Sequence, residues 1–488
     1  MGALHAGHAA LVRRAAEPRA AGPPRVLLSV FVNPLQFGPG EDFARYPRTL
    51  EQDAERAAAA GAHALFAPPL AEIYPGGDGQ ITRVLPPASL QNALCGRSRP
   101  GHFDGVATVV CRLLALVRPA RVLFGEKDWQ QVLILRRVVA DLALPVVLES
   151  CATEREPDGL ARSSRNRYLT PPDRARAAAL PAALASAATA LRAGADAAEA
   201  LAACRARLAA AALAVDYLEL VQAHTLAAQP RLEGLTLLAA AVHCGPARLI
   251  DHVFLMRRPP IVAIDGPAGA GKSTVTRAFA RRLGLVYLDT GAMYRALTWW
   301  VQHQGVDPAD ATAVAPLLEG LDLRLSGAAE DQRVTINGHD VSAAIRSLEV
   351  TALVSTVAAH GCVREALTQQ QKAMGRSGGL VAEGRDIGTA VFPDADCKVF
   401  LTATVAERAR RRAEDLRQRG FAVPALAELE AQIAERDRLD SSRAIAPLRQ
   451  AEDAVELVTD GMDVAAVIQA LVDLFRARVP QEAWPDPA

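Results

Sequence analysis

The sequence has few cysteines, and no two of them stand at a spacing typical of a metal or redox site. Seven are spread over 488 residues without a CxxC pair, which indicates neither a zinc site nor a disulfide framework. Such usage is typical of a reducing cytosol, so we expect a cytoplasmic protein. The sequence also lacks the roughly 18 consecutive apolar residues that a membrane helix requires. Charged residues interrupt even the alanine-rich stretch at 175–215, and no basic-then-apolar leader opens the sequence. We therefore expect no membrane contact.

The sequence also lacks an excess of charge of either sign. Lysine plus arginine and aspartate plus glutamate each number 54, which gives no overall attraction for nucleic acid. A tRNA-binding role is further disfavoured because no basic stripe with interleaved aromatic residues is present. Half of the residues are apolar and 22% are charged, as in globular proteins. The length favours two to four domains.

The clearest domain boundary is the segment MRRPP, residues 256–260. Proline lacks a backbone donor and restricts the residue before it, so regular structure tends to end here. The strand-like run IVAID and a glycine-rich loop follow at once, as at the start of an α/β domain. Residues 1–255 and 261–488 are each long enough to fold alone, and we predict that 256–260 links them.

The first of these regions is predicted to contain a parallel, doubly wound sheet. Short apolar runs alternate with helical patterns; the runs lie at 25–33, 63–68, 120–128 and 144–150. From about residue 169 the sequence pattern predicts alanine-rich helices, followed by the strand-like runs VDYLELVQA and LTLLAAAVHCG. We therefore divide the region into a domain at 1–168 and a small α+β subdomain at 169–255.

The stretch GPAGAGKST in the second region matches the phosphate-loop pattern GxxxxGK[ST]. Its glycines let several backbone amides point at the same phosphate oxygens, and the following helix presents its positive end. Lys272 is expected to reach the terminal phosphates, and Ser273 to bind Mg²⁺. A chance glycine-rich turn is the alternative, but the strand pattern before the loop and the helix pattern after it argue against one. The loop predicts ATP-dependent phosphoryl transfer.

Arginines recur through the rest of the second region, and their guanidinium groups suit bidentate contacts with phosphate. For the run ERARRRAEDLRQR alone, a solvated helix surface is the better interpretation. The segments DTGAMYR, EGRDIGT and RDRLDSSR, the last followed by APL, resemble the bacterial cytidylate kinase family over essentially all of 261–480. The resemblance implies phosphorylation of CMP or dCMP by ATP. The β-rich pattern and NG turn at 321–346 also resemble an insert of that family.

The kinase resemblance assigns residues to two subsites. ATP would contact the phosphate loop and a mobile lid, at Gly266, Gly269, Gly271, Lys272, Ser273, Thr274, Arg408, Arg411 and Arg412. Lys272 would be catalytic. The acceptor nucleotide would contact Thr290 and Arg295, with Arg385 and Arg436 also on its phosphate, Ser355, Arg364 and Asp386 on the cytosine edge, and Asp440 and Arg443 on the sugar.

The first region opens with an HxGH element, His5 to His8. Two imidazoles on the first helical turn can donate hydrogen bonds to phosphate, and the helix N-terminus favours the negative charge of a leaving pyrophosphate. Alone, the element is equally well explained as a helix start with two surface histidines. Three further polar segments follow predicted strands or form a loop: NPLQF, GEKDWQQ and SSRNRYL. Ligands of open α/β sheets bind at the carboxyl ends of strands, so together these segments favour a nucleotide site.

These segments, with FARYPRTL and SRPGHFDGV, resemble the pantothenate synthetase (pantoate–β-alanine ligase) family over residues 1–255. The resemblance implies ATP-dependent formation of pantoyl adenylate with Mg²⁺ assistance, followed by displacement of AMP by β-alanine. ATP would contact Met1, Gly2, His5, His8, Gly125, Lys127, Asp128, Arg162, Ser163, Ser164 and Arg165, with His8 as the nominal acid and Lys127 also catalytic. Gln36 and Gln131 would hold pantoate, and Gln36 would border β-alanine. The subdomain at 169–255 supports dimers in the family, which implies a homodimer.

The expected fold is therefore α/β, with a Rossmann-like HxGH nucleotidyltransferase domain and small α+β subdomain followed by a P-loop nucleoside monophosphate kinase domain. The leading hypothesis is one bifunctional enzyme, since fusions of these two activities occur in some bacteria. The alternative is an active kinase carrying a truncated, inactive ligase domain as an assembly scaffold. The partners expected on either hypothesis are small molecules, with no nucleic acid.

Two departures from the ligase family stand out. Glu154 occupies a position near the adenine where relatives usually have an apolar residue. The family also has a strand just before the methionine equivalent to Met1, with no counterpart in this sequence. We expect the neighbouring strands to lose a ladder partner and several buried amides to be unpaired, at about 1–3 kcal/mol each. This reasoning predicts that the natural protein starts some 25–35 residues earlier, roughly one helix and one strand.

Overall fold

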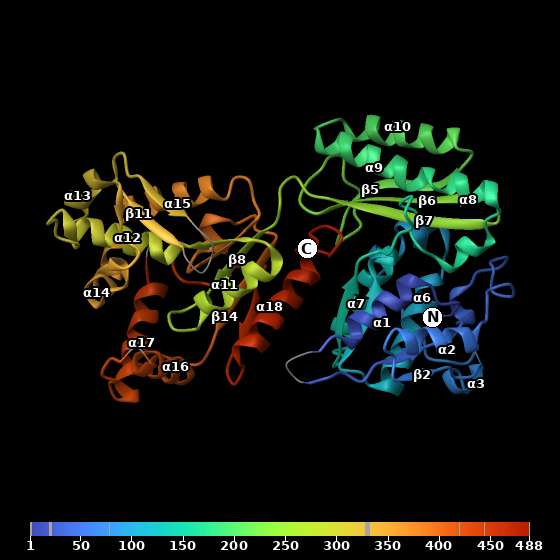
Figure 1. Cartoon of the computed structure of the whole chain (residues 1–488), viewed down its shortest axis with the longest axis horizontal. Coiled ribbons are helices and arrows are strands. Elements are labelled where there is room, and N and C mark those ends of the chain that lie inside the picture. The colour runs from blue at the N-terminus through green and yellow to red at the C-terminus, as the bar shows by residue number, and fades with distance from the viewer. Residues whose placement is uncertain are drawn as a thin grey trace. The chain divides into compact units, whose positions relative to one another are not determined.

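The computed structural model describes residues 2–18, 22–77, 79–326, 332–418, 420–443 and 445–487. The chain forms two compact units (Figure 1). The first comprises Met1–Arg257 with Pro480–Ala483, and the second comprises Arg258–Val479 with Trp484–Ala488. In the part of the chain that is described, no helix is long and apolar enough to cross a membrane.

The parallel strands of the first unit form where the apolar runs predict them. Strand β1 (Leu27–Ser29) pairs with β2 (Ala64–Phe66), and β3 (Arg121–Gly125) pairs with β4 (Val147–Cys151). They do not form the single sheet that we predicted, because no strand among the described residues joins the two pairs. Helix α1 (Ala6–Ala16) begins after residues 2–5, which are not a strand.

A side chain satisfies the backbone at the start of this unit. We expected unpaired buried amides there, and for Ala3 and Leu4 the expectation is wrong. Their N–H groups donate to the carboxylate oxygens of Asp53, at 2.9 and 2.7 Å. Asp53 lies on α2 (Leu50–Ala59), is 0% exposed, and also accepts from Thr49 Oγ1 at 3.2 Å. A carboxylate thus supplies the acceptors that a neighbouring strand would otherwise provide.

The other short elements of the first unit connect and flank these strands. They are η1 (Pro34–Gln36), α3 (Leu70–Ile73), α4 (Ala88–Gln91), α5 (Leu94–Ser98), α6 (His102–Val117), η2 (Glu126–Asp128), α7 (Trp129–Asp141) and η3 (Ser164–Tyr168). The loops that carry the predicted ATP contacts follow β3 and β4, at the carboxyl ends of those strands. This is the edge where open α/β sheets bind ligands.

An antiparallel sheet completes the first unit. Its strands β5 (Ala214–Gln222), β6 (Thr236–Cys244) and β7 (Ala247–Leu255) pair in chain order; β7 was not among the predicted strands. Along β6, Leu238, Ala240 and Val242 pack into one core, while the alternate residues face a second core shared with α6 and α7. The regions 1–168 and 169–255 therefore share buried contacts.

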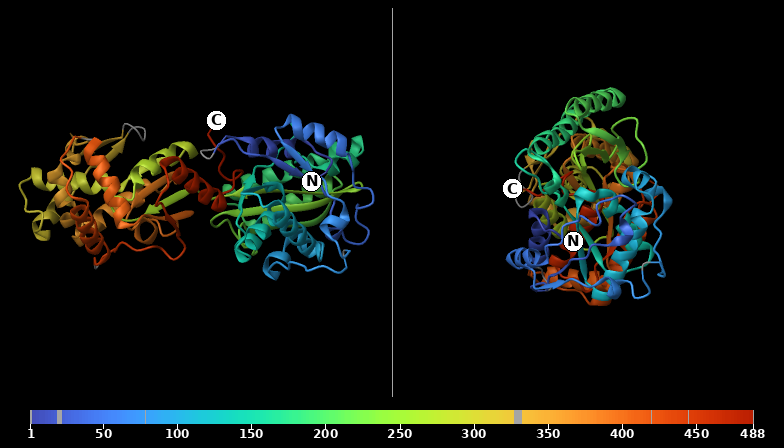
Figure 2. Two further views of the ribbon diagram at one scale, coloured as in Figure 1. Left: turned by 90° about the horizontal axis from the view of Figure 1, so that it is seen from below. Right: turned by 90° about the vertical axis from the view of Figure 1, so that its right-hand side faces the viewer.

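Three helices pack against this sheet: α8 (Pro171–Ala177), α9 (Ala179–Arg192) and α10 (Ala197–Ala210). Helices α9 and α10 lie side by side along one face of the sheet in both ribbon figures (Figures 1 and 2). Thr170 caps α8 by accepting from the Asp173 amide, with Pro171 at the first helical position, as the sequence predicts.

The second unit is built on a five-stranded parallel sheet in the order β15-β14-β8-β13-β9. These strands are β8 (Ile261–Asp265), β9 (Val286–Asp289), β13 (Leu380–Gly384), β14 (Cys397–Thr402) and β15 (Val455–Val458). Their residues are mostly buried, as expected for a parallel sheet covered on both faces. The central strand β8 leads into the glycine-rich loop and α11 (Lys272–Leu283), which is the strand–loop–helix order that the sequence predicts.

The remaining elements surround this sheet. The helices are α12 (Thr290–His303), α13 (Ala311–Val314), η4 (Ala315–Leu318), η5 (Ala344–Arg346), α14 (Leu348–Val357), α15 (Gly361–Met374), η6 (Ile387–Val391), α16 (Val405–Gln418), α17 (Leu426–Ser441) and α18 (Val464–Arg478). The predicted β-rich insert is present as antiparallel β10 (Leu323–Ser326), β11 (Arg333–Ile336) and β12 (His339–Asp340). Residues 327–331 of the insert lie outside the described residues.

Candidate active sites

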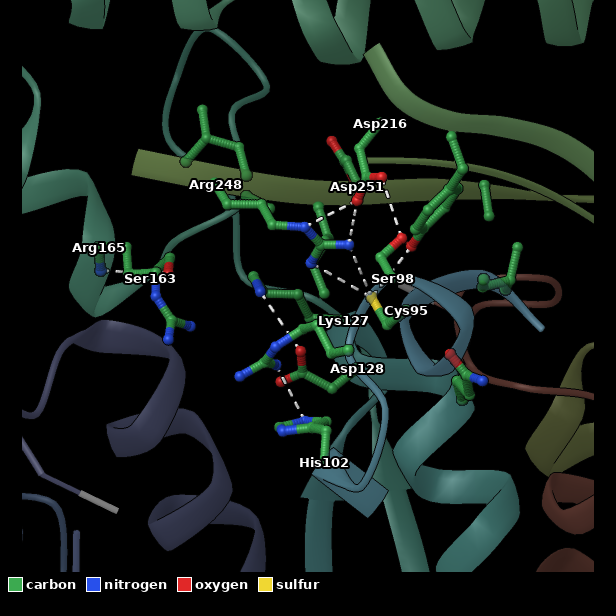
Figure 3. A pocket seen from close by; sticks show the side chains of 18 of the residues that line it. Cys95, Ser98, His102, Lys127, Asp128, Ser163, Arg165, Asp216, Arg248 and Asp251 are labelled. Atoms are coloured by element: carbon green, nitrogen blue, oxygen red, sulfur yellow. Dashed lines mark hydrogen bonds and ion pairs between the residues drawn. The ribbon is translucent and has the colours of Figure 1, made fainter. Parts of the chain in front are cut away.

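A cavity of about 410 Å³ in the first unit gathers several of the predicted ligase residues. Figure 3 shows Lys127 and Asp128, from η2, in the same cavity as Ser163, which caps η3, and Arg165, which lies within η3. Gln131 on α7 also lines it. Lys127 Nζ lies 3.5 Å from Asp128 Oδ1. Burial alone would raise the pKa of Asp128, but the cations of Lys127 and Arg165 lower it below its usual value.

The two histidines of the HxGH element are held by local backbone hydrogen bonds. His5 is the N-cap of α1, and its Nδ1 accepts from the Gly7 amide at 3.2 Å. His8 Nδ1 accepts from the His5 amide, also at 3.2 Å. Because both Nδ1 atoms act as acceptors, each neutral ring carries its proton on Nε2. Both imidazoles therefore keep an N–H donor that these contacts do not use.

The surroundings keep both imidazoles neutral at pH 7. Burial lowers the pKa of His5 to about 4, and the nearby cations Lys127 and Arg162 lower it further. Burial also lowers the pKa of His8 to about 3, with the adjacent His5 contributing. The Asp128 carboxylate opposes these shifts, because a nearby negative charge favours the protonated imidazole.

Other predicted ligase residues lie outside the lining of this cavity; they are Gly2, His5, His8, Gly125, Arg162, Ser164 and Gln36. Ser164 is buried and shares a hydrogen bond with the Tyr46 hydroxyl at 2.9 Å. Arg162 lies 3.1 Å from Glu156. Gln36 Oε1 accepts from Asn33 at 3.3 Å. Met1 lies outside the described residues.

The sequence prediction missed two cavity residues that fasten the Gln36 segment. Arg99 donates to the Gln36 carbonyl at 3.2 Å, and His102 Nδ1 is 2.7 Å from the same oxygen. Arg99 also pairs with Glu41. Burial, together with the Arg99 cation, lowers the pKa of His102 to about 4. Arg99 and His102 both lie in the motif SRPGHFDGV, which pointed to the ligase family. The motif alone did not assign a role to either residue.

In the second unit, the phosphate loop has the strained backbone that its glycines permit. Gly266 has φ of +150°, and a Cβ on it would lie 2.0 Å from the Leu401 carbonyl oxygen, so no other residue fits. Lys272 Nζ donates to the carbonyls of Gly266 and Pro267, both at 2.8 Å. Burial and the nearby Arg385 lower the pKa of Lys272.

A cavity of about 880 Å³ lies over this loop and brings together nearly all of the predicted kinase residues. Its lining includes Gly269, Gly271, Lys272, Ser273, Thr274, Thr290, Arg295, Ser355, Arg364, Arg385, Asp386, Arg411, Arg412, Arg436, Asp440 and Arg443. Gly266 and Arg408 do not line it. Arg408 is buried, donates to the Ala268 carbonyl at 3.0 Å and pairs with Asp437 at 2.6 Å. Arg408 therefore connects the phosphate loop to α16 and α17 on the side away from the cavity.

One wall of this cavity carries a cluster of arginines with too few acidic partners. Asp440 forms ion pairs with both Arg385, at 3.0 Å, and Arg443. Arg295 pairs with Asp289 at 3.1 Å. Arg436 has a buried Nε without a hydrogen-bond partner, and burial and Arg385 lower its pKa. A cluster with this excess of positive charge is suited to a phosphate group.

A buried ion pair lies beside this cluster. Arg364 and Asp386 are 2.5 Å apart, with side chains only 4% and 7% exposed. The Arg364 guanidinium also lies 5.6 Å from the centre of the Tyr294 ring. The pair presents both donors and acceptors in a fixed arrangement, which is what recognition of a base edge requires.

Glu383, at the end of β13, is a cavity residue that the prediction missed. Its Oε1 accepts from Ser273 Oγ at 2.5 Å and from the Tyr287 hydroxyl at 2.8 Å. Its Oε2 is buried without a hydrogen-bond partner. Burial raises its pKa, and the nearby Asp289 carboxylate adds to that rise. A hydroxyl beside an unsatisfied carboxylate oxygen fits a hard divalent cation.

Comparisons with known proteins assign a family to each of the two regions. The family model for pantoate-beta-alanine ligase matches residues 1–254, and that for cytidylate kinase matches residues 262–477. A bifunctional pantoate ligase/cytidylate kinase of Synechococcus sp. (strain CC9605) is 65% identical, over 100% of this chain and 99% of that protein. The chain belongs to the bifunctional pantoate ligase/cytidylate kinase family. Its two activities are pantoate–β-alanine ligation and cytidylate phosphorylation, so the resemblances drawn from the motifs are confirmed.

Other members and solved structures were also matched. The bifunctional pantoate ligase/cytidylate kinase of Parasynechococcus marenigrum (strain WH8102) is 65% identical, over 100% of this chain and 95% of that protein. A crystal structure of pantothenate synthetase from Thermus thermophilus is 47% identical, with a TM-score of 0.49, over 52% of this chain and 90% of that chain.

Proposed function

We propose that the ligase reaction takes place at the HxGH element and the adjoining cavity, in a Rossmann-like nucleotidyltransferase domain. The pantoate carboxylate attacks the α-phosphate of ATP, giving pantoyl adenylate and pyrophosphate, and the β-alanine amine then displaces AMP. ATP is held by Gly2, His5, His8, Gly125, Lys127, Asp128, Arg162, Ser163, Ser164 and Arg165, and pantoate by Gln36 and Gln131. The cavity that gathers Lys127, Asp128, Gln131, Ser163 and Arg165 is the observation that carries this assignment.

The tautomers of the histidines define their part in this step. With pKa values of about 4 and about 3, His5 and His8 are neutral at pH 7 and donate through Nε2–H. His8 therefore stabilises charge on the phosphate oxygens as a hydrogen-bond donor rather than as a proton-transferring acid. Lys127 adds a full positive charge, and no covalent intermediate with the protein is needed because the work is positioning and charge stabilisation.

In the kinase domain we propose in-line transfer of the ATP γ-phosphoryl group to CMP or dCMP. The phosphate loop and Lys272 hold the donor phosphates, with Gly266 shaping the loop, and Arg412 and Arg411 close over them. Arg295, Arg385 and Arg436, which belong to the cluster with an excess of positive charge, hold the acceptor phosphate. Thr290 also contacts the acceptor; Ser355, Arg364 and Asp386 read the cytosine edge, and Asp440 and Arg443 the sugar.

Mg²⁺ is the metal that these residues fit. Among the described residues no group of three or more histidine, cysteine or acidic side chains could enclose a metal. Ser273 and Glu383 would instead supply one face of the ion, with nucleotide phosphates and water on the other, which is how proteins usually bind Mg²⁺. When bound, the ion neutralises charge on the transferring phosphoryl group. We propose the same ion for the ligase, where no residue is assigned to it.

We further propose a cytoplasmic homodimer that pairs through the 169–255 subdomain and uses small-molecule substrates only. The alternative, in which the first unit is an inactive scaffold, is separated by two assays on one full-length preparation. Pantoate-dependent release of AMP from ATP reports the ligase, and CMP-dependent formation of ADP reports the kinase. Turnover by both supports the assignment, whereas kinase turnover without AMP release supports the scaffold.

A further inference from the structure

A short segment near the C-terminus of the chain completes the first unit. Although Pro480–Ala483 follow helix α18 of the kinase domain, they pack within the ligase unit. The backbone amides of Gln481 and Glu482 donate to the two carboxylate oxygens of Glu126, each at 2.9 Å. Glu126 is 0% exposed and also accepts from Ser150 Oγ at 2.8 Å. A buried carboxylate depends on such donors, because its charge has no access to water.

The side chain of Glu482 reaches a second loop of the same unit. Its Oε1 accepts from the Thr153 amide at 2.8 Å and from the Thr153 hydroxyl. Its Oε2 lies 3.7 Å from both Arg155 and His252. Arg155 is fixed in turn by two hydrogen bonds to Asp251, both 2.9 Å long. Glu482 therefore connects the loop after β4 to strand β7.

One of the two loops that this segment touches carries residues of the proposed ATP site, and the other borders that site. Glu126 stands between Gly125 and Lys127, so its orientation fixes where η2 places the Lys127 amine. Thr153 precedes Glu154, whose carbonyl accepts the Arg162 amide at 2.9 Å. A Cβ on Gly7 would lie 3.7 Å from Glu154 Cβ, so the same loop also borders the HxGH turn.

We infer that Gln481 and Glu482 are positioning residues for the ligase, which hold the loops at 125–128 and 152–155 in the geometry that binds ATP. The inference rests on the ATP site proposed above. On this inference, residues that follow the last helix of the kinase domain in sequence help to position the active site of the ligase. We assign the segment no contact with substrate; its hydrogen bonds go to Glu126 and to the loop that carries Ala152 and Thr153.

The test compares two positions in this segment in the full-length protein. Glu482→Ala removes the contacts to Thr153, whereas Glu482→Gln keeps an amide oxygen that can accept them. The control, Asp486→Asn, removes an equal charge four residues later, where Asp486 pairs with Arg476 in the kinase unit. Ligase kcat and KM for ATP and for pantoate are measured for each variant, together with kinase turnover.

We expect Glu482→Ala to raise the ligase KM for ATP about tenfold, the effect of losing roughly one or two hydrogen bonds at the loop. The KM for pantoate and the kinase turnover should stay within about twofold, and Glu482→Gln should recover most of the ATP affinity. A merely structural role would instead lower the active fraction, so kcat would fall at unchanged KM.

An unchanged KM for ATP in Glu482→Ala, or an equal rise in Asp486→Asn, overturns the inference. Lys127→Ala separates this failure from failure of the proposed site, because it should raise the same KM directly. If Lys127→Ala leaves the KM for ATP unaltered, the proposed ATP site is wrong and the inference falls with it. If Lys127→Ala raises the KM for ATP but Glu482→Ala leaves it unchanged, the proposed ATP site is retained and the positioning role is rejected.

Discussion

Replacing Asp53 by alanine should loosen the start of helix α1 and with it the HxGH element. Asp53 is fully buried and accepts from the amides of Ala3 and Leu4 at 2.9 and 2.7 Å. Without the carboxylate these two buried N–H groups lose their acceptors, at about 1–3 kcal/mol each, so the expected loss of stability is about 2–6 kcal/mol. The residues freed lie directly before His5, so ligase turnover should fall as well.

Hydrogen exchange is the most direct assay, since it reports the amides concerned. In Asp53→Ala, amides at the start of α1 should exchange at least tenfold faster than in the unaltered protein, with the kinase unit unchanged. Glu55→Ala, on the exposed face of the helix α2 that also carries Asp53, is the matched control and should leave exchange unaltered. If Asp53→Ala shows unaltered exchange at residues 2–8 and normal ligase turnover, the carboxylate does not anchor the HxGH element.

Three further outcomes are expected. His8→Ala should slow pantoyl adenylate formation by roughly 10²-fold or more, as for the loss of one charge-stabilising donor, and a normal single-turnover rate would exclude the role given to its Nε2. Folding lowers the pKa of His5 to about 4 and that of His8 to about 3, from an ordinary value of 6.5. The unfolded chain therefore binds more protons below pH 6.5, so the free energy of unfolding is full above pH 6.5 and falls as the pH drops from 6.5 towards 4. Denaturant unfolding at pH 7 and pH 5 should show this fall in the unaltered protein and a smaller one when both are glutamine; equal falls contradict it. Arg385→Met should raise the kinase KM for CMP at least tenfold and leave the KM for ATP within about threefold, and initial rates that show the opposite pattern would reassign the residue.

The kinase site was largely predictable because local chemistry determines most of it. The glycine spacing of the phosphate loop permits only one kind of backbone, and the flanking strand and helix patterns place that loop at the carboxyl edge of a sheet. The cavity over the loop then gathers the arginines that motif resemblance selected. Arg408 differs, because its contacts with Ala268 and Asp437 depend on how α16 and α17 pack, which no sequence pattern encodes.

The ligase unit was less predictable because its key contacts join residues far apart in the sequence. Nothing around Asp53 marks it as an acceptor for residues 3 and 4, since an acidic residue on an alanine-rich helix is usually exposed. The break between the two parallel strand pairs depends on tertiary pairing rather than on the apolar runs, which form strands as predicted. Glu126 likewise receives its two backbone donors from a segment more than 350 residues later.

Two independent sites on one chain are tested by removing the kinase lysine and following both reactions. In Lys272→Ala, CMP phosphorylation should be abolished, because the amine held at the phosphate loop is lost, while pantoate-dependent AMP release should stay within a few-fold of normal. Loss of both activities in a variant that remains folded would contradict the assignment of two separate nucleotide sites.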